Sequence, residues 1–416
     1  MNLAVLSLLA LLGAVVAGTL LRVNIGLLAI ALAFAIGVLV GDMTVKEVSA
    51  GFPADLFLTL VAVTLLFSQA QVNGTLERIS ALSLRLTHGR IGFVPLMFFG
   101  LALLLASIGP GNIAATALLA PVAMSAAARA GVPAFLMALM VCNGANAGAF
   151  SPFAPTGIIA NGLMAQIGLA GYEWRTYFNT LLPQAAIAAA GYLVFGGGRL
   201  LLRGGGSLEQ QSGTEERRLD WRQWLTLLAI GALVASVVLL EVNVMIGAFV
   251  AATLLALAHA GDAKEALARM PWDTILLVCG VTVLLGLVDR TGGMDLFAGL
   301  LAKLSTPDSV TAVMAFVTGA VSVYSSSSGV VLPAFLPTVP ALIEKLGGGD
   351  ALAIAWSIDV GAHLVDVSPL STLGALCIAA AQAQQRRERL FNQMLAWGLS
   401  MTLVGAAVSW LFFGVL

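Results

Sequence analysis

Three ionisable side chains lie close together in a stretch that is otherwise apolar, Ile358 to Gly374. Asp359, His363 and Asp366 stand at positions i, i+4 and i+7, which places them on one face of a helix. Ionisable groups in a hydrocarbon environment are unfavourable and commonly mark a functional site. The pattern predicts a cation or proton site. An equally open interpretation is a structural pair, or a helix face turned toward a water-filled cavity.

The same stretch contains a Ser-Pro step, and a related stretch occurs earlier, between Cys142 and Gly157. Proline removes a backbone donor and interrupts a helix, so each stretch is predicted to be a broken helix. Asp359, His363 and Asp366 are replaced in the earlier copy by Cys142, Asn146 and Ala149, so the two sites are not chemically equivalent. At an offset of 217 residues, four positions match: Gly144 with Gly361, Asn146 with His363, Ser151 with Ser368, and Gly157 with Gly374.

The composition indicates a membrane protein built of helices. Hydrophobic residues make up 59% of the 416 residues and charged residues only 10%, and the mean hydropathy is +0.99. Such a chain cannot bury its apolar surface in a water-soluble core. No basic cluster with interleaved aromatic residues points to nucleic acid, and no Walker motif points to ATP-driven transport. The cysteines lack metal-ligand spacing and are interpreted as packing residues: Cys142, Cys279 and Cys377.

Apolar runs long enough to cross a bilayer recur along the chain. Two segments, 91–130 and 308–346, each have two apolar arms around a small or polar tip, which predicts re-entrant hairpins. For each hairpin, the alternative is a pair of short true spans. Segments 75–88 and 292–303 look amphipathic and are expected to lie along the membrane interface. The predicted spans are 3–21, 25–41, 55–72, 135–168, 175–199, 223–240, 244–260, 273–288, 351–383 and 391–414.

A hydrophilic connector at 206–222 divides the chain into two repeats, 1–205 and 223–416. Landmarks such as Asn24 and Asn243 recur in the same order at offsets near 218. Each repeat holds five spans and one hairpin, and an odd number of crossings makes the repeats inverted. One side of the membrane then carries 15 of the 20 Lys and Arg residues. The positive-inside rule makes that side cytoplasmic, so the linker is cytoplasmic and both termini lie outside.

The hairpin tips and helix breaks expose backbone and small polar groups that suit two kinds of ligand. Unpaired N–H groups at a helix N-terminus favour an anionic carboxylate, whereas unpaired carbonyls at a C-terminus favour Na⁺. Na⁺ is therefore a candidate ligand at the tips and breaks. The predicted substrate-binding residues are Gly111, Asn112, Asn146, Ser151, Thr156, Ser327, Ser328, Gly329, Ser368, Ser371 and Thr372. The predicted cation or proton coupling residues are Ser107, Asn143, Ser325, Ser326, Asp359, His363 and Asp366.

The segment from Gly111 to Val122 resembles the Ser-Asn-Thr hairpin motif, with its following proline, of the divalent anion/sodium symporter (DASS) family in the ion transporter superfamily. Asn112 matches the Asn of that motif, whereas Gly111 and Ile113 replace its Ser and Thr. The second motif corresponds to residues 327–329, with Ser in place of Asn. Within the family the chain is most similar to a bacterial malonate/dicarboxylate carrier. The resemblance implies an elevator-type carrier, as a homodimer, with cation sites beside a carboxylate substrate.

The sequence thus predicts an all-α polytopic membrane protein, a secondary carrier of the bacterial inner membrane and not an enzyme. The expected substrate is a small organic anion, a C3 or C4 dicarboxylate such as malonate, and the coupling ion is Na⁺ or H⁺. The expected partners are this anion, the coupling ion, membrane lipid and a second copy of the chain, with no cofactor other than a coupling Na⁺ and no nucleic acid.

Two other function classes are alternatives to this prediction. The first is a cation/proton antiporter of the same superfamily, with Asp359, His363 and Asp366 as the ligands of the transported ion. The second is an intramembrane hydrolase, which is disfavoured because one His and two carboxylates on one helix form a poor metal site without a nucleophile motif.

Overall fold

The structure is a computed structural model that describes residues 2–21, 23–76, 78, 91–202, 219–240, 242–323, 325–381 and 387–415. Within these ranges every regular element is helical, which confirms the predicted all-α class. Six of the described helices are long and apolar enough to cross a membrane, and shorter apolar helices accompany them. Most of the predicted linker and most of the segment 75–88 lie outside the described residues.

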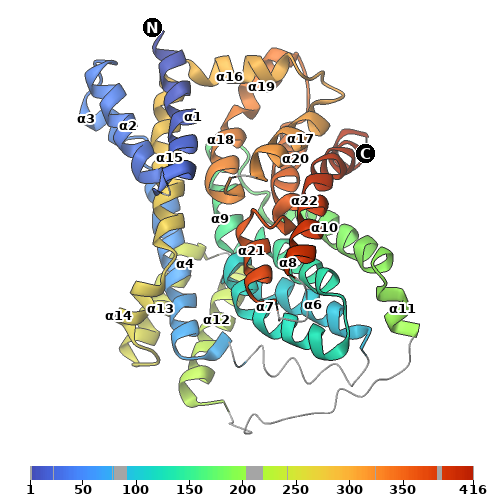
Figure 1. Ribbon diagram of the computed structural model, residues 1–416. Helices are drawn as coiled ribbons and strands as arrows, with labels where there is room; N and C mark the ends of the chain where they lie inside the picture. The colour runs from blue at the N-terminus through green and yellow to red at the C-terminus, as the bar shows by residue number, and fades with distance from the viewer. Residues whose placement is uncertain are drawn as a thin grey trace.

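One column of helices contains the beginning of each half of the chain (Figure 1). Asn24 caps the start of α2 and Asn243 caps the start of α13, so these two counterparts have the same local role. A Cβ on Gly26 of α2 would lie 2.0 Å from the carbonyl oxygen of Leu276 in α15, so these helices pack backbone to backbone. The column consists of α1 (Leu3–Leu21), α2 (Ile25–Leu39), α3 (Val45–Ser49), α4 (Ala54–Val72), α12 (Trp221–Leu240), α13 (Val244–Leu257), α14 (Ala263–Arg269) and α15 (Trp272–Arg290).

The other helices form a second group beside this column (Figure 1). A Cβ on Gly144 of α8 would lie 2.4 Å from the carbonyl oxygen of Phe99 in α6, and a Cβ on Gly361 of α20 would lie 2.3 Å from that of Ala315 in α17. Both halves therefore use a glycine at matching positions for the same close helix contact. The group includes α6 (Phe93–Ile108), α7 (Gly111–Ala130), α8 (Ala134–Ala149), α9 (Pro155–Gln166), α10 (Glu173–Val194), α11 (Gly197–Leu202), α17 (Val310–Ser322), α20 (Ala351–Leu364), α21 (Thr372–Ala379), α22 (Arg387–Ser409) and η6 (Trp410–Val415).

Two helical hairpins are formed by α6 with α7 and by α17 with the short helices that follow it. In the first, α6 and α7 are joined at Gly109, whose φ of 139° only glycine adopts readily. In the second, α17 leads to a tip at Ser326 and then to a returning arm that prolines divide into short pieces. These pieces are η2 (Ser327–Val331), α18 (Leu332–Phe335), η3 (Leu336–Thr338) and α19 (Val339–Leu346), and α19 packs against α16 (Gly293–Ala302). Figure 1 places α6 and α7 in the lower half of the view and α17 and α18 in the upper half.

The two predicted broken helices are interrupted at their Ser-Pro steps. α8 ends at Ala149 before α9 begins, and α20 passes through η4 (Val365–Val367) before α21 begins. The two turns are alike, because Ser151 Oγ accepts from the N–H of Phe153 at 3.3 Å and Ser368 Oγ accepts from the N–H of Leu370 at 3.3 Å. The local chemistry of the repeated step therefore gives the same backbone turn twice.

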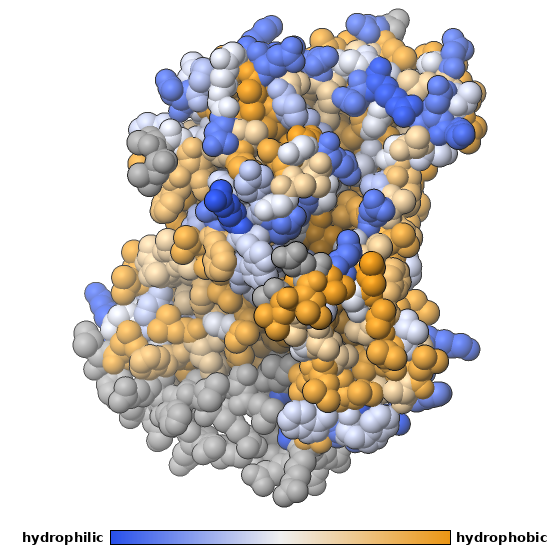
Figure 2. Space-filling view, turned by 180° about the vertical axis from the view of Figure 1, so that it is seen from behind, coloured by the Kyte–Doolittle hydropathy of each residue, from blue (hydrophilic) through white to orange (hydrophobic). Residues whose placement is uncertain are grey.

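The outer surface carries many large apolar side chains, as expected for contact with lipid. Leu39 is 79% exposed, and Val194 and Leu239 are each 75% exposed. Figure 2 shows polar residues gathered at the upper end of the molecule and broad apolar areas below them. The chain is therefore a multi-pass membrane protein.

Candidate functional site

Polar side chains from both hairpins and both breaks meet in the interior, and this cluster is called the polar centre below. Most of its members are at most 6% exposed, and Ser328 is half-buried. Buried polar groups are expected to be paired, and here the partners come from distant parts of the chain. The polar centre consists of Asn112, Asn146, Thr156, Ser322, Ser327, Ser328, His363 and Asp366.

Asn146, in the last turn of α8, connects four elements. Its Oδ1 accepts from Asn112 Nδ2 at 2.8 Å. Its Nδ2 donates to the carbonyl oxygen of His363 at 2.9 Å and lies 3.5 Å from Asp366 Oδ2. The side chain is fully buried. One amide therefore joins the first hairpin, the first break and the second break, and it contacts its own counterpart in the other half, His363.

Among the described residues, Asp366 accepts hydrogen bonds from neutral donors only. Ser327 Oγ donates to its Oδ1 at 2.7 Å, and Ser322 Oγ lies 2.6 Å from Ser327 Oγ. Ser371 donates to the backbone carbonyls of Asp366 and Ser368. The carboxylate and the carbonyls at this break thus accept hydrogen bonds from hydroxyl and amide donors.

His363 lies between the second hairpin tip and the first break. Its Nδ1 is 3.0 Å from the carbonyl oxygen of Asp359, and its Nε2 is 3.2 Å from Ser328 Oγ. Ser328 Oγ is in turn 3.0 Å from Thr156 Oγ1, at the start of α9. The ring of Phe150 packs edge-on against the imidazole, with centroids 4.7 Å apart. A line of hydroxyls therefore runs from the start of α9 to the imidazole.

Four helices begin around the polar centre, and they are capped differently. The residues that precede α7 and α9, Pro110 and Ala154, make no side-chain cap, and Asn112 Oδ1 accepts from the N–H of Ile113 in the first turn of α7 at 3.0 Å. Ser326 caps η2 and Ser371 caps α21. The two uncapped ends are adjacent, because a Cβ on Gly111 would lie 3.0 Å from Pro155 Cδ. Uncapped N–H groups and the positive end of the helix dipole favour an anion. The arrangement therefore suits a carboxylate at the α7 and α9 ends. None of the eight side chains of the polar centre is a Lys or Arg, so the backbone N–H groups would supply the attraction for the anion.

The structure brings together only part of the predicted site. Asn112, Asn146, Thr156, Ser327, Ser328, His363 and Asp366 meet in the polar centre, and Gly111 and Gly329 stand beside it at the two tips. Ser151, Ser368 and Ser371 bond within their own turns, Ser326 caps η2, and Thr372 is exposed on α21. Ser107 pairs with Tyr177, Asn143 with Leu139, and Ser325 with Val321, apart from the polar centre.

Two residues of the site were missed from sequence. Ser322 ends α17 and extends the Ser327 hydroxyl chain, and Phe150 packs on the imidazole. Their spacing carries a weak signal: Ser322 stands five residues before Ser327, and Phe150 directly precedes the first Ser-Pro step.

Asp359 differs from its two ionisable neighbours. The side chain is fully buried, and among the described residues neither carboxyl oxygen has a hydrogen-bond partner. Burial of an unpaired carboxylate is strongly unfavourable unless a cation or proton accompanies it. In the described part of the chain, however, no three His, Cys, Asp or Glu side chains come together to hold a metal ion.

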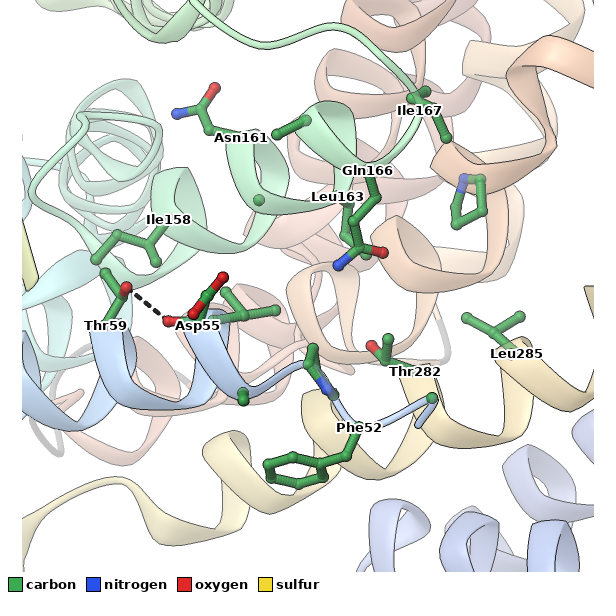
Figure 3. Close-up of a pocket in the computed structure, with 18 of the residues that line it drawn as sticks. Phe52, Asp55, Thr59, Ile158, Asn161, Leu163, Gln166, Ile167, Thr282 and Leu285 are labelled. Carbon is green, nitrogen blue, oxygen red and sulfur yellow. Dashed lines mark hydrogen bonds between the residues drawn. The ribbon is translucent and has the colours of Figure 1, made fainter. Parts of the chain in front are cut away.

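A cavity of about 1120 Å³ lies among α4, α9, α15 and the returning arm of the second hairpin. Figure 3 shows Asp55 and Thr59 of α4, Gln166 of α9 and Thr282 of α15 around it. The cavity contacts the first break through Pro152 and Ile158 but includes no member of the polar centre. Its lining has no Lys or Arg and includes four carboxyl side chains: Asp55, Glu173, Asp289 and Asp295.

Comparison with known proteins bears on both the fold and the family. Residues 1–149 match a protein family described as "Dicarboxylate carrier protein MatC N-terminus", which confirms the resemblance to dicarboxylate carriers. The solved structure of the YdaH transporter of Alcanivorax borkumensis, reported to have an unusual topology, is similar in fold with a TM-score of 0.54. The two sequences are 15% identical, and the match covers 89% of this chain and 87% of that chain. No curated protein sequence matches the chain.

Proposed function

We propose that this chain, whose first 149 residues match a dicarboxylate carrier family, is a secondary carrier of C3 or C4 dicarboxylates driven by H⁺ or Na⁺. The observation that carries the proposal is the meeting of the uncapped α7 and α9 ends, where a Cβ on Gly111 would lie 3.0 Å from Pro155. Backbone N–H groups at two adjacent helix ends can bind a carboxylate without a basic side chain.

The second carboxylate of the acid can bind at the start of η2, which lies beside the start of α9. The 3.0 Å contact between Thr156 and Ser328 sets the start of η2 beside the start of α9. Because η2 is a second helix N-terminus beside α9, an acid with two carboxylates can reach one helix end in each half, although Ser326 occupies the N–H of Gly329 there. A short dicarboxylate suits this separation better than a monocarboxylate.

The arrangement also supports an elevator mechanism in the bacterial inner membrane. Two groups of helices lie side by side, with both hairpins and both breaks in or against one of them (Figure 1). Asn146 donates to the backbone of its counterpart His363, and contact between counterparts is expected of residues that lie near a two-fold axis between repeats. We expect a homodimer with both termini outside, in which the polar centre moves against the column of α1, α2, α4, α12, α13 and α15.

A cation/proton antiporter remains the second candidate, and one observation favours it. Asp359 is a fully buried carboxyl group without a partner among the described residues, as expected for a group that binds a transported cation or proton. In that case no organic anion would occupy the α7 and α9 ends.

Transport into proteoliposomes separates the two candidates. We expect labelled malonate or succinate to accumulate when a pH gradient or a Na⁺ gradient is imposed, with one gradient clearly more effective than the other. The control is liposomes without protein under the same gradients. Na⁺/H⁺ exchange in the absence of any organic anion uptake would replace the carrier proposal by the antiporter.

Substitution of Asn112 tests the position of the substrate. Asn112→Ala removes the donor to Asn146 Oδ1 at 2.8 Å and leaves that buried oxygen unpaired. An unpaired buried polar group costs about 1–3 kcal/mol, so we expect succinate to bind about tenfold or more weakly in calorimetry. Asn392→Ala, at an exposed position of α22, is the matched control and should bind as wild type. Equal affinities of the two variants would remove the first hairpin tip from the site.

A further inference from the structure

We propose that the hydroxyl line Thr156–Ser328–His363 couples binding of the anion to uptake of one proton at His363 Nε2. The inference rests on the proposed function, since it takes the anion to bind at the start of α9. It adds the identity of a coupling ion and the route by which the two ligands sense each other.

The geometry determines which groups of the line donate and which accept. A carbonyl oxygen can only accept, so the 3.0 Å contact with the Asp359 carbonyl requires a proton on Nδ1 of His363. In the neutral imidazole Nε2 then accepts, and its partner at 3.2 Å is the hydroxyl of Ser328. A serine hydroxyl has one proton, so Ser328 Oγ must accept from Thr156, 3.0 Å away. Thr156 donates to Ser328, and Ser328 donates to His363.

An anion at the start of α9 reverses this line. Thr156 is the second residue of α9. Its hydroxyl therefore donates a hydrogen bond to a carboxylate that binds at this helix end. Thr156 Oγ1 is then only an acceptor, and the hydrogen bond with Ser328 persists if Ser328 donates to it. Ser328 Oγ must in turn accept from His363, which requires a proton on Nε2 as well as on Nδ1. The imidazole therefore gains a proton from water when the anion binds and returns it when the anion leaves.

In the described part of the chain, the side-chain hydrogen-bond partner of the imidazole is the hydroxyl of Ser328. Phe150 covers one edge of the imidazole, and neither Asp359 nor Asp366 hydrogen-bonds to the ring through its carboxyl group. Of the elements packed against α20, α17, α18, η2, η4 and η6 add no titratable side chain other than Asp366. The titratable or charged residues of the others are Cys142 on α8, Glu173, Arg175, Tyr177 and Tyr192 on α10, Glu344 and Lys345 on α19, and Arg387, Glu388 and Arg389 on α22.

The hydroxyl line at Asp366 does not offer the same coupling. Ser327 links this carboxylate to Ser322 at the end of α17, within the second half of the chain. Its connection to α7 runs through the amide of Asn146, which donates to Asp366 and accepts from Asn112. An amide cannot exchange its donor and acceptor roles as a hydroxyl does, so this connection is not reversed by an anion. The Thr156–Ser328 contact joins residues 172 positions apart and links the two halves through hydroxyls, which can each donate or accept.

Proton uptake on binding can be measured directly. Calorimetric titration of the full-length protein with succinate, in buffers of different ionisation enthalpy, reports the number of protons taken up per anion. Work between about pH 7 and 8.5 keeps both carboxyl groups of the acid ionised. We expect uptake approaching one proton, so that the dissociation constant rises up to about tenfold per pH unit. Anion binding without proton uptake would overturn the relay and leave the carrier proposal intact, whereas no dicarboxylate binding would overturn both.

Three variants locate the proton. His363→Gln keeps a polar side chain that cannot gain a proton, and Ser328→Ala breaks the line. Each variant should reduce the number of protons taken up per bound succinate to less than half of the wild-type value. If Ser328→Ala does not fold, Thr156→Val breaks the same line at its other end. Ser357→Ala is the matched control, because this buried hydroxyl of α20 bonds to Ala353 of its own helix at 2.7 Å. Wild-type proton uptake in Ser328→Ala or Thr156→Val would exclude the relay.

Discussion

Replacing Asn146 by alanine is expected to abolish dicarboxylate uptake, with a loss of at least about 100-fold in initial rate. The amide donates to the His363 carbonyl at 2.9 Å and accepts from Asn112 at 2.8 Å, so its removal takes away two buried hydrogen bonds and the acceptor of Asn112 Nδ2. An unpaired buried polar group costs about 1–3 kcal/mol, and loss of the amide also separates the first hairpin from the second break, which it joins.

The comparison for Asn146→Ala is a second asparagine outside the polar centre. Asn161 lies on α9, which follows the first break, and its Nδ2 has no hydrogen-bond partner in the described part of the chain. Asn161→Ala should therefore keep most of the wild-type uptake in proteoliposomes. Both variants should be checked for folding by size-exclusion chromatography in detergent. If a well-folded Asn146→Ala carried substrate as fast as Asn161→Ala, the polar centre would not be the transport site.

Gly157→Ala should destabilise the first break and lower uptake about tenfold or more. A Cβ on Gly157 would lie 2.1 Å from the carbonyl oxygen of Ser151, and backbone atoms cannot move aside as a flexible side chain can. Gly374 has the same constraint in the second break, where a Cβ would lie 2.0 Å from the carbonyl oxygen of Ser368. We expect either change to cost roughly 2–4 kcal/mol and to lower the melting temperature in detergent by about 5 °C or more.

Gly162→Ala provides the control on the same helix. A Cβ on Gly162 would approach only Leu56 Cδ1, at 3.3 Å, which is the end of a side chain that can shift. Alanine also favours a helix over glycine by about 1 kcal/mol, so the melting temperature of Gly162→Ala should be near that of wild type or above it. A normal melting temperature for Gly157→Ala would mean that the turn at the break tolerates a side chain and is not tightly built.

The helices and their interruptions were largely predictable from sequence because they depend on local chemistry. Long apolar runs form helices in a membrane, since every backbone group must be paired within the segment. Pro152 and Pro369 remove a donor and end the preceding helix, and Gly157 and Gly374 admit the close backbone contact at each turn. Asn24 and Asn243 each precede an apolar run and cap the helix that this run forms. The inverted relation of the two repeats remains a prediction.

The candidate site was predictable only in part, and the reason is physical. Asp359, His363 and Asp366 share one helix face by their spacing, and the sequence alone treats them as one group. The structure separates them: Asp366 bonds to Ser327, His363 lies beside Ser328, and Asp359 has no partner among the described residues. A side chain's partner is set by which distant segment packs against it, and the spacing along one helix does not contain that information.

By itself the sequence determined that this chain is a helical membrane protein, where its helices break, and which family of carriers it resembles. These properties follow from hydropathy, proline and glycine, which act within a few residues. Only the tertiary structure decided that Asn146 touches its counterpart His363 and that Thr156 reaches Ser328 across the two halves. Hydroxyls and amides can pair with many groups, so which group each one meets depends on the packing of segments far apart in the chain.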